Sequence, residues 1–224
     1  MIVPDKIVRT SRKTIALIVN QEGQLIVRAP KRVSNQRIWA FIEEKKAWII
    51  EKQAAAREKR SRTAGHTFAP GESFLYLGEA YPLEIVPAAR PALSLTNGAF
   101  RLASSAAPRA RDAFTRWYRQ QARVVLEERT RRLAEYHRLK FETLRISSAK
   151  TRWGSCSSLG TLSFTWRLVM APLAVIDYVV IHELAHLVEK NHSTRFWEKV
   201  AAMMPDYAEK RRWLKENGAR LSLE

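Results

Sequence analysis

The chain has 224 residues, of which 46% are hydrophobic and 27% are charged. These proportions are typical of a folded globular protein with a sizeable core, and they exclude a largely disordered chain. The formal net charge of +17 favours anionic partners such as nucleic acid, nucleotides, acidic proteins or anionic lipid, although many basic enzymes carry surplus Arg and Lys for no specific ligand.

Cysteine usage and the N-terminus indicate the compartment. Cys156 is the single cysteine, which excludes an intramolecular disulfide and agrees with a reducing cytosol. The stretch "MIVPDKIVRTSRKT" lacks the apolar segment and the small-residue cleavage site of a signal peptide. The sequence has no run of about 18 apolar residues that would predict a membrane-spanning helix. We therefore expect a cytoplasmic protein with no membrane partner.

The N-terminal part of the chain predicts strands on either side of a helix. Residues 14–29, "TIALIVNQEGQLIVRA", form two β-rich runs around Glu22-Gly23, which is a hairpin signal. Ser34 is a suitable N-cap for a helix that begins near Asn35 and carries an apolar stripe. Further strands follow a basic connection, and the Asn-Gly pair in "LSLTNGAFRL" marks a second hairpin. These elements form a basic N-terminal strand-helix-strand region.

Residues 103–108, "ASSAAP", form a small-residue linker and are the best candidate for a domain boundary. This boundary predicts a β-rich region with one helix at residues 1–103 and a second domain at residues 109–224. A long helix from about Arg109 to Lys140 opens the second domain. Its arginines form either a solvated helix face or a stripe that contacts a polyanion. They are Arg109, Arg111, Arg116, Arg119, Arg123, Arg129, Arg131, Arg132 and Arg138.

The next elements predict a buried helix after a small group of strands. The segment "TLRISSAKTRWGSCSSLGTLSFTWRLVMAP" indicates strands around a turn at residues 158–160, and Pro172 suits the first turn of the helix that follows. That helix, "LAVIDYVVIHELAHLVEK", is apolar almost all round apart from Asp177, which predicts burial. Buried polar groups need partners, so the histidines and the glutamate inside this helix require an explanation.

The buried helix carries the motif His-Glu-x-x-His, in which two histidines bind zinc and the glutamate acts as general base. His182 and His186 are four residues apart, so both project from one helix face with Cβ atoms about 5–6 Å apart. Two ring nitrogens can then reach one ion at the zinc–imidazole distance of about 2.0–2.1 Å. Glu183 follows His182 and can lean over a water on that ion. The motif predicts two metal ligands and a catalytic glutamate.

His192 is the predicted third ligand. It comes six residues after His186, so the chain must turn before it can reach the same ion. Asn191 tolerates the left-handed conformation of a helix end, and Ser193 can cap the next helix. Three neutral imidazoles leave a fourth position open, which is the pattern of a catalytic zinc site. The alternative is a set of histidines without a metal, or a later carboxylate as third ligand. The carboxylates are Glu198, Glu209 and Glu216, of which Glu209 is the best spaced.

The segment "RWGSCSSLGTLSFTWRLVMAPLAVIDYVVIHELAHLVEKNHSTRFWEKV" resembles the YgjP-like metallopeptidase-domain family, which is related to the WLM and SprT-type zincins. The resemblance is strong over about residues 140–217 and weaker over the basic N-terminal region. It implies an α+β, zincin-like catalytic domain. It also implies that His182, His186 and His192 bind zinc and that Glu183 is catalytic. One departure is Thr165, where the family pattern leads us to expect Asn.

These features predict a zinc-dependent hydrolase, foremost a metallopeptidase that acts on proteins or peptides. Zinc lowers the pKa of its bound water to about 7, and Glu183 takes the proton as that water attacks. The net charge of +17 keeps two alternatives open. One is a metal-dependent nucleotide pyrophosphatase or phosphohydrolase, and the other is a basic nucleic-acid-associated protein with a zinc site. The candidates for stabilising an oxyanion are Arg152, Tyr178 and Tyr207.

Overall fold

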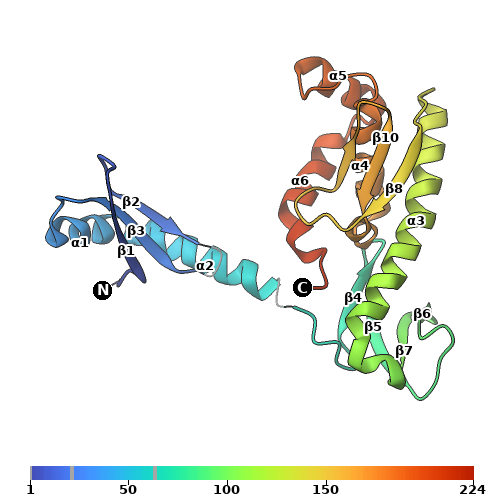
Figure 1. Ribbon diagram of the computed structural model, residues 1–224, viewed down its shortest axis with the longest axis horizontal. Coiled ribbons are helices and arrows are strands. Elements are labelled where there is room, and N and C mark those ends of the chain that lie inside the picture. The colour runs from blue at the N-terminus through green and yellow to red at the C-terminus, as the bar shows by residue number, and fades with distance from the viewer. Residues whose placement is uncertain (1, 21–22, 63–64) are drawn as a thin grey trace. The chain divides into compact units, whose positions relative to one another are not determined.

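The computed structural model describes residues 2–20, 23–62 and 65–224. The chain divides into two compact units, Met1–Ala64 and Gly65–Glu224, which are called unit 1 and unit 2 below. Each unit has its own cluster of buried apolar side chains. The two units are therefore described one at a time (Figure 1).

Unit 1 contains a three-stranded sheet with the order β1-β3-β2. The central strand β3 is parallel to β1 and antiparallel to β2. The pairing of β2 with β3 confirms the first predicted hairpin, and Gly23 has a φ of 81°, which an L side chain rarely adopts. Glu22 lies outside the described residues. The strands are β1 (Lys6–Thr10), β2 (Ala16–Val19) and β3 (Leu25–Pro30).

Two helices, α1 (Asn35–Glu44) and α2 (Lys46–Arg62), follow the sheet of unit 1. The predicted cap is confirmed, because the Ser34 side chain accepts a hydrogen bond from the backbone N–H of Arg37 at 3.3 Å. The sheet and the helices share a small core, which is marginal in size for a unit of this length. Its buried residues are Leu25, Val27, Ala29, Ile38, Ile42 and Ile49.

Unit 2 begins with a four-stranded sheet of order β4-β5-β7-β6. The pairing of β6 with β7 confirms the second predicted hairpin. Asn97 and Gly98 between these strands have φ angles of 52° and 77°, as a tight hairpin turn requires. The strands are β4 (Ser73–Tyr76), β5 (Glu79–Val86), β6 (Leu93–Thr96) and β7 (Ala99–Ala103).

This sheet packs against elements that follow it in the chain. The domain boundary is therefore not at residues 103–108, where it was expected. The small-residue segment forms the short helix η1 (Ser104–Arg109), which leads from β7 into α3 (Ala110–Tyr136). Phe74 of β4 stacks on Phe114 of α3 with ring centroids 4.1 Å apart. The structure therefore divides between Ala64 and Gly65, and its strands β4 to β7 belong to unit 2. Small residues look like a flexible linker in the sequence, yet here they allow close packing of η1.

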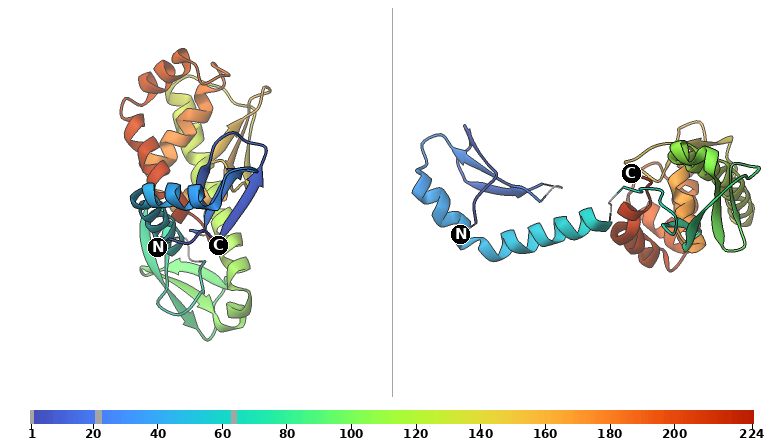
Figure 2. Two further views of the ribbon diagram at one scale, coloured as in Figure 1. Left: turned by 90° about the vertical axis from the view of Figure 1, so that its left-hand side faces the viewer. Right: turned by 90° about the horizontal axis from the view of Figure 1, so that it is seen from below.

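A second sheet of unit 2 has the order β8-β10-β9, with β10 parallel to β8 and antiparallel to β9. The apolar helix α4 packs against β9, α3, α5 and α6. Helix α3 runs beside both sheets (Figures 1 and 2). Unit 2 is thus a mixed α/β fold. The remaining elements are β8 (Thr143–Ser147), β9 (Gly154–Cys156), β10 (Thr161–Thr165), η2 (Trp166–Met170), α4 (Leu173–Ala185), α5 (Thr194–Met203), α6 (Tyr207–Asn217) and η3 (Gly218–Arg220).

Several arginines of α3 have partners inside unit 2. Arg129 forms a two-point ion pair with Asp177 of α4, with Nε 2.7 Å from Oδ1. Arg119 donates to the Ser148 hydroxyl at 2.7 Å, and Arg111 donates to the carbonyl of Leu223 at 2.6 Å. These arginines hold elements of the fold together. Among the described residues, no helix is long and apolar enough to cross a membrane.

Candidate metal centre

Helix α4 carries polar side chains inside a buried apolar segment. Val180, Ile181, Leu184 and Ala185 are at most 1% exposed, so α4 forms the middle of unit 2. Pro172 precedes the helix and the backbone N–H groups of the first turn bond to its carbonyl. Burial on most sides fixes the helix, and the side chains at its C-terminal end are therefore well positioned for a site.

The chain turns directly after α4, which ends at Ala185 with His186 as its C-cap. The predicted cap of α5 is present, because the Ser193 hydroxyl accepts from the backbone N–H of Phe196 at 3.4 Å. Asn191 is not among the residues with positive φ, so the turn does not use the left-handed conformation expected there. The backbone N–H of Ser193 bonds to the Asn191 carbonyl at 2.8 Å instead. This turn brings the residue between them back toward α4.

The three histidines meet at the end of α4. Each of His182, His186 and His192 offers one ring nitrogen, and these atoms all lie within 4.8 Å of one another. The ring centroids are 5.0, 5.0 and 4.7 Å apart for the pairs 182–186, 182–192 and 186–192. The arrangement could hold a metal ion, since the nitrogens of three imidazoles converge on one point.

Hydrogen bonding sets which nitrogen of His186 is free. Its Nδ1 lies 3.0 Å from the carbonyl oxygen of Glu189. A carbonyl only accepts, so Nδ1 carries the proton and Nε2 has a free lone pair. A bond of this kind to the outer nitrogen also orients many metal-binding histidines. The Glu189 side chain takes no part in it.

His182 and His192 present their nitrogens directly to each other, with the two Nε2 atoms 3.0 Å apart. Two such atoms at this distance either share one proton or face a common cation. The Nδ1 atom of His182 is buried and has no hydrogen-bond partner among the described residues. Burial, followed by the neighbouring histidines and Arg211, lowers the pKa of His182 to about 3. A neutral imidazole is the form that binds a metal.

Aromatic side chains of α5 cover one side of the histidines. Phe196 is fully buried and stacks on His186 with centroids 4.4 Å apart. Trp197 stacks on His192 at 5.8 Å and on Tyr207 of α6 at 5.5 Å. This packing restricts rotation of the imidazole rings and keeps water from that side.

Glu183 lies next to the histidines and is 5% exposed. Burial raises the pKa of its carboxyl group to about 8, although the positive charge of Arg152 opposes the rise. The side chain packs directly on Gly154 of β9, where an added Cβ would lie 2.6 Å from Cγ and Oε1 of Glu183. Any larger residue at this position would require the Glu183 side chain to shift. Gly154 lies in the sequence "WGSCS" of residues 153–157, where no local pattern indicates its contact with Glu183.

A pocket of about 270 Å³ opens beside Glu183 and His182. It lies between the start of β9, helix α4 and helix α6. Of the three candidates for oxyanion stabilisation, Arg152 and Tyr178 line this pocket, whereas Tyr207 stacks behind Tyr178 at 6.5 Å. The lining residues are Arg152, Trp153, Gly154, Tyr178, Val179, His182, Glu183, Arg211 and Leu214.

Other residues considered from the sequence lie elsewhere. Glu209 is on α6, pairs with Lys210 at 3.4 Å, and is 70% exposed at its side chain, and it is not part of the histidine cluster. The Cys156 thiol donates to the Ser157 carbonyl at 3.4 Å, and burial raises its pKa. Thr165, where Asn was expected, is buried and donates from its hydroxyl to the Ala149 carbonyl at 2.8 Å. Thr165 thus ties β10 to the loop before β9.

These features define unit 2 as a mixed α/β domain with a candidate metal site beside a buried carboxylate. The chain matches the YgjP-like, metallopeptidase domain family over residues 13–217. The chain therefore belongs to this family, which implies a metal-dependent peptidase with protein or peptide substrates.

No curated protein matches the chain. One matching solved structure is described as the metallopeptidase zymogen of Pyrococcus abyssi abylysin. It shares 23% sequence identity, covers 41% of this chain and 93% of that chain, and has a TM-score of 0.37.

Proposed function

We propose that this protein is a zinc-dependent peptidase, with His182, His186 and His192 as the metal ligands and Glu183 as the general base. The observation that carries the proposal is the convergence of three imidazole nitrogens within 4.8 Å beside a buried carboxylate and an open pocket. Membership of a metallopeptidase family supports the same reaction class.

The donor set fits zinc. Imidazole is a common zinc ligand, and three protein ligands with one open position are typical of catalytic sites. Ligand atoms of a tetrahedral site with bonds of about 2.0–2.1 Å lie roughly 3.3 Å apart, close to the 3.0 Å between the His182 and His192 Nε2 atoms. The unpartnered Nδ1 of His182 and the protonated Nδ1 of His186 leave their Nε2 atoms for the ion.

A zinc ion in this position supplies Lewis-acid chemistry, which lowers the pKa of a water and polarises a carbonyl. Glu183 accepts the proton from the attacking water and returns it to the leaving amine. Burial raises the pKa of this carboxyl group, and a divalent cation beside it would lower that pKa and so favour the carboxylate, which is the form that accepts a proton. Tyr178 lines the pocket, and we propose that its hydroxyl group donates to the carbonyl oxygen as charge develops there.

We propose that the substrate is a protein or peptide rather than a nucleotide. The family is a metallopeptidase family, and the pocket has apolar walls from Trp153, Tyr178, Val179 and Leu214. The nucleotide pyrophosphatase alternative rests on the basic charge of the chain. We retain the cytoplasm as the proposed location because the single Cys156 suits a reducing compartment.

The test compares the wild-type chain with Glu183→Gln, both loaded with zinc. Gln keeps the size of the side chain but cannot take the proton, so we expect unchanged zinc content and a loss of peptide hydrolysis of about 10²–10⁴-fold. Protein substrates and nucleoside triphosphates are screened in parallel with both proteins. Full peptidase activity in the purified variant would contradict the role of Glu183, and variant-sensitive hydrolysis of triphosphates alone would contradict the peptidase.

A further inference from the structure

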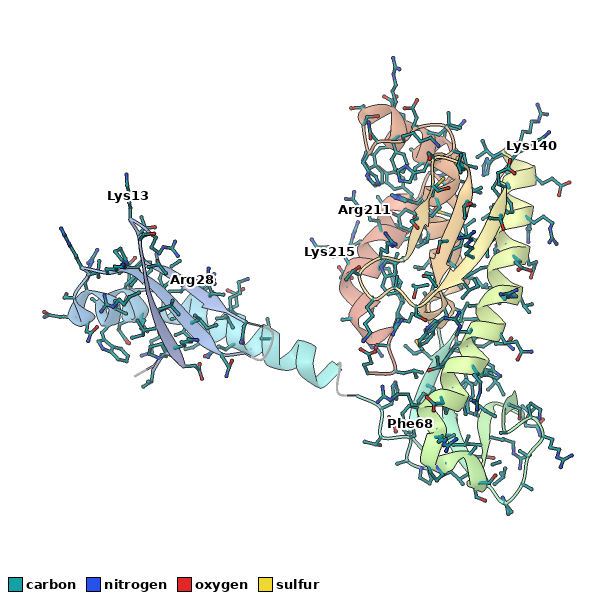
Figure 3. All side chains as sticks on the ribbon, viewed as in Figure 1. Lys13, Arg28, Phe68, Lys140, Arg211 and Lys215 are labelled. Atoms are coloured by element: carbon teal, nitrogen blue, oxygen red, sulfur yellow. The ribbon has the colours of Figure 1, made fainter. Side chains whose placement is uncertain are left out.

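The pocket beside Glu183 contains two arginines that the proposed reaction does not use. Arg152 lies just before β9, and Arg211 lies on α6, where Figure 3 shows its position. Two elements far apart in the chain therefore bring positive charge to one pocket. Among the residues that line it, Glu183 is the acidic one.

Neither guanidinium group is neutralised within the described part of the chain. Arg152 and Arg211 are exposed and have no ion-pair partner there. Asp206 and Glu209, the two acidic residues that precede Arg211 in this part of the chain, both pair with Lys210. This differs from Arg129, whose charge is matched by Asp177. Two free guanidinium groups at the rim of a pocket can take an anion.

Packing holds Arg211 in place at the rim. Its guanidinium carbon lies 4.6 Å from the centroid of the Trp197 ring, as in a cation–π contact. Trp197 in turn stacks on the ring of His192. The contact orients the arginine and leaves its N–H donors available, because a ring face offers no acceptor oxygen.

Both arginines share their pocket with groups of the proposed reaction, because His182 and Glu183 line it as well. An anion bound between the arginines would therefore lie close to the site of the reaction.

From this arrangement we propose that Arg152 and Arg211 bind a carboxylate of the substrate, so that the enzyme favours peptides with a carboxylate near the cleaved bond. The inference rests on the proposed peptidase function. Guanidinium groups bind carboxylates through two parallel hydrogen bonds, and the apolar walls from Trp153 and Leu214 suit the methylene groups of an acidic side chain. The carboxylate belongs either to an Asp or Glu side chain or to the C-terminus of a peptide, and the experiment separates these sources.

The first arm measures binding without cleavage, with the zinc-loaded full chain carrying Glu183→Gln, at about 150 mM salt so that general attraction to the basic surface is screened. Three fluorescent peptides of one length are compared. One has blocked ends and contains Asp and Glu, the second replaces them by Asn and Gln, and the third is the second with a free C-terminal carboxylate. We expect at least one carboxylate peptide to bind about tenfold or more tightly than the blocked neutral peptide, and the tighter of the two identifies the source.

Matched variants decide whether the two arginines cause the preference. Arg152→Gln and Arg211→Gln should each reduce a tenfold preference about threefold if their contributions add, and the double variant should abolish it. Arg212→Gln removes the same charge from the next residue of α6, which does not line the pocket, and should leave the preference intact. Equal binding of all three peptides, a preference that survives in the double variant, or an equal loss in Arg212→Gln would overturn the proposal.

The second arm measures cleavage of the same peptides by the wild-type, zinc-loaded chain. If the carboxylate peptides bind more tightly through the two arginines but no peptide is cleaved, the pocket assignment holds and the peptidase proposal fails. Cleavage of neutral and carboxylate peptides at equal rates means that the peptidase proposal holds and the pocket assignment fails. Faster cleavage of the carboxylate peptide, lost in the double variant, supports both.

Discussion

Helices α3 and α4 pack against each other in unit 2, yet they differ in where several of their charged and titratable side chains lie. Charged groups of α3 lie at the surface or, as for Arg129, in an ion pair. On α4, Glu183 is buried without a counter-charge in contact, and the Nδ1 atom of His182 is buried without a partner among the described residues. An unpaired buried polar group lowers stability, and two such groups on adjacent residues of α4 mark a candidate site. The number of charges on a helix therefore says less about function than their burial does.

The same comparison explains Asp177, a charged residue of α4 that has a structural role. Its carboxylate faces α3 and binds the Arg129 guanidinium at two points, with side-chain exposures of 14% and 17%. The hydrogen bond and the charge of Asp177 raise the pKa of Arg129 further above its ordinary value. Asp177 and Glu183 thus lie on one helix, but only Asp177 is neutralised by a neighbour.

Among the substitutions that test this comparison, Gly154→Ala should have the largest effect, which is a loss of catalytic activity. The new Cβ would overlap Cγ and Oε1 of Glu183, so the carboxylate must move. A displacement of about 1 Å at a reacting group can reduce activity about 10²-fold, and we expect a loss of that order. Ser155→Ala, in the same strand, is the control and should retain activity. The measurement is kcat/KM at equal zinc content, and wild-type activity in Gly154→Ala would show that Glu183 need not be held where the structure has it.

A smaller effect is expected when the ion pair between the two helices is broken. Asp177→Asn keeps the shape of the side chain but leaves Arg129 without its counter-charge. We expect the free energy of unfolding of unit 2 to fall by about 1–3 kcal/mol, with zinc content unchanged. Urea unfolding of the full chain measures the change. A variant as stable as the wild type would mean that the pair contributes little, as surface pairs do.

The smallest effect is expected on the outer face of α3. Arg123 and Arg131 are exposed, and we interpret them as part of a solvated face. The double variant Arg123→Gln/Arg131→Gln should change the free energy of unfolding by less than about 0.5 kcal/mol. It should also leave the salt dependence of any DNA or RNA binding unchanged. If the logarithmic slope of binding against salt falls by about two, one for each arginine, the face contacts phosphate and the solvated interpretation is contradicted.

Local signals in the sequence predicted much of this fold. The two hairpins and the caps at Ser34 and Ser193 depend on a few neighbouring residues, and the structure has all four. The domain boundary depends on tertiary packing, which is why the small residues at 103–108 were misleading. The end of α4 at Ala185 also comes earlier than the apolar pattern indicates, since the pattern continues through the turn.

The site shows the same division between local and distant information. The spacing of His182, Glu183 and His186 follows from helix geometry, and the turn chemistry pointed to His192. The contact of Gly154 with Glu183 and the approach of Arg211 to the same pocket join segments far apart in the chain. No local pattern encodes such contacts, so they became visible only in the three-dimensional structure.

The most direct test of the central claim is the zinc content of three purified proteins after dialysis against a weak chelator: the wild type, His192→Ala and Glu209→Ala. The claim is that the three histidines hold the metal. His192 supplies one nitrogen of the cluster, whereas Glu209 is an exposed carboxylate outside it. We predict about one zinc per chain in the wild type and in Glu209→Ala, and a sharp loss in His192→Ala. Loss of zinc from Glu209→Ala with retention in His192→Ala would contradict the account.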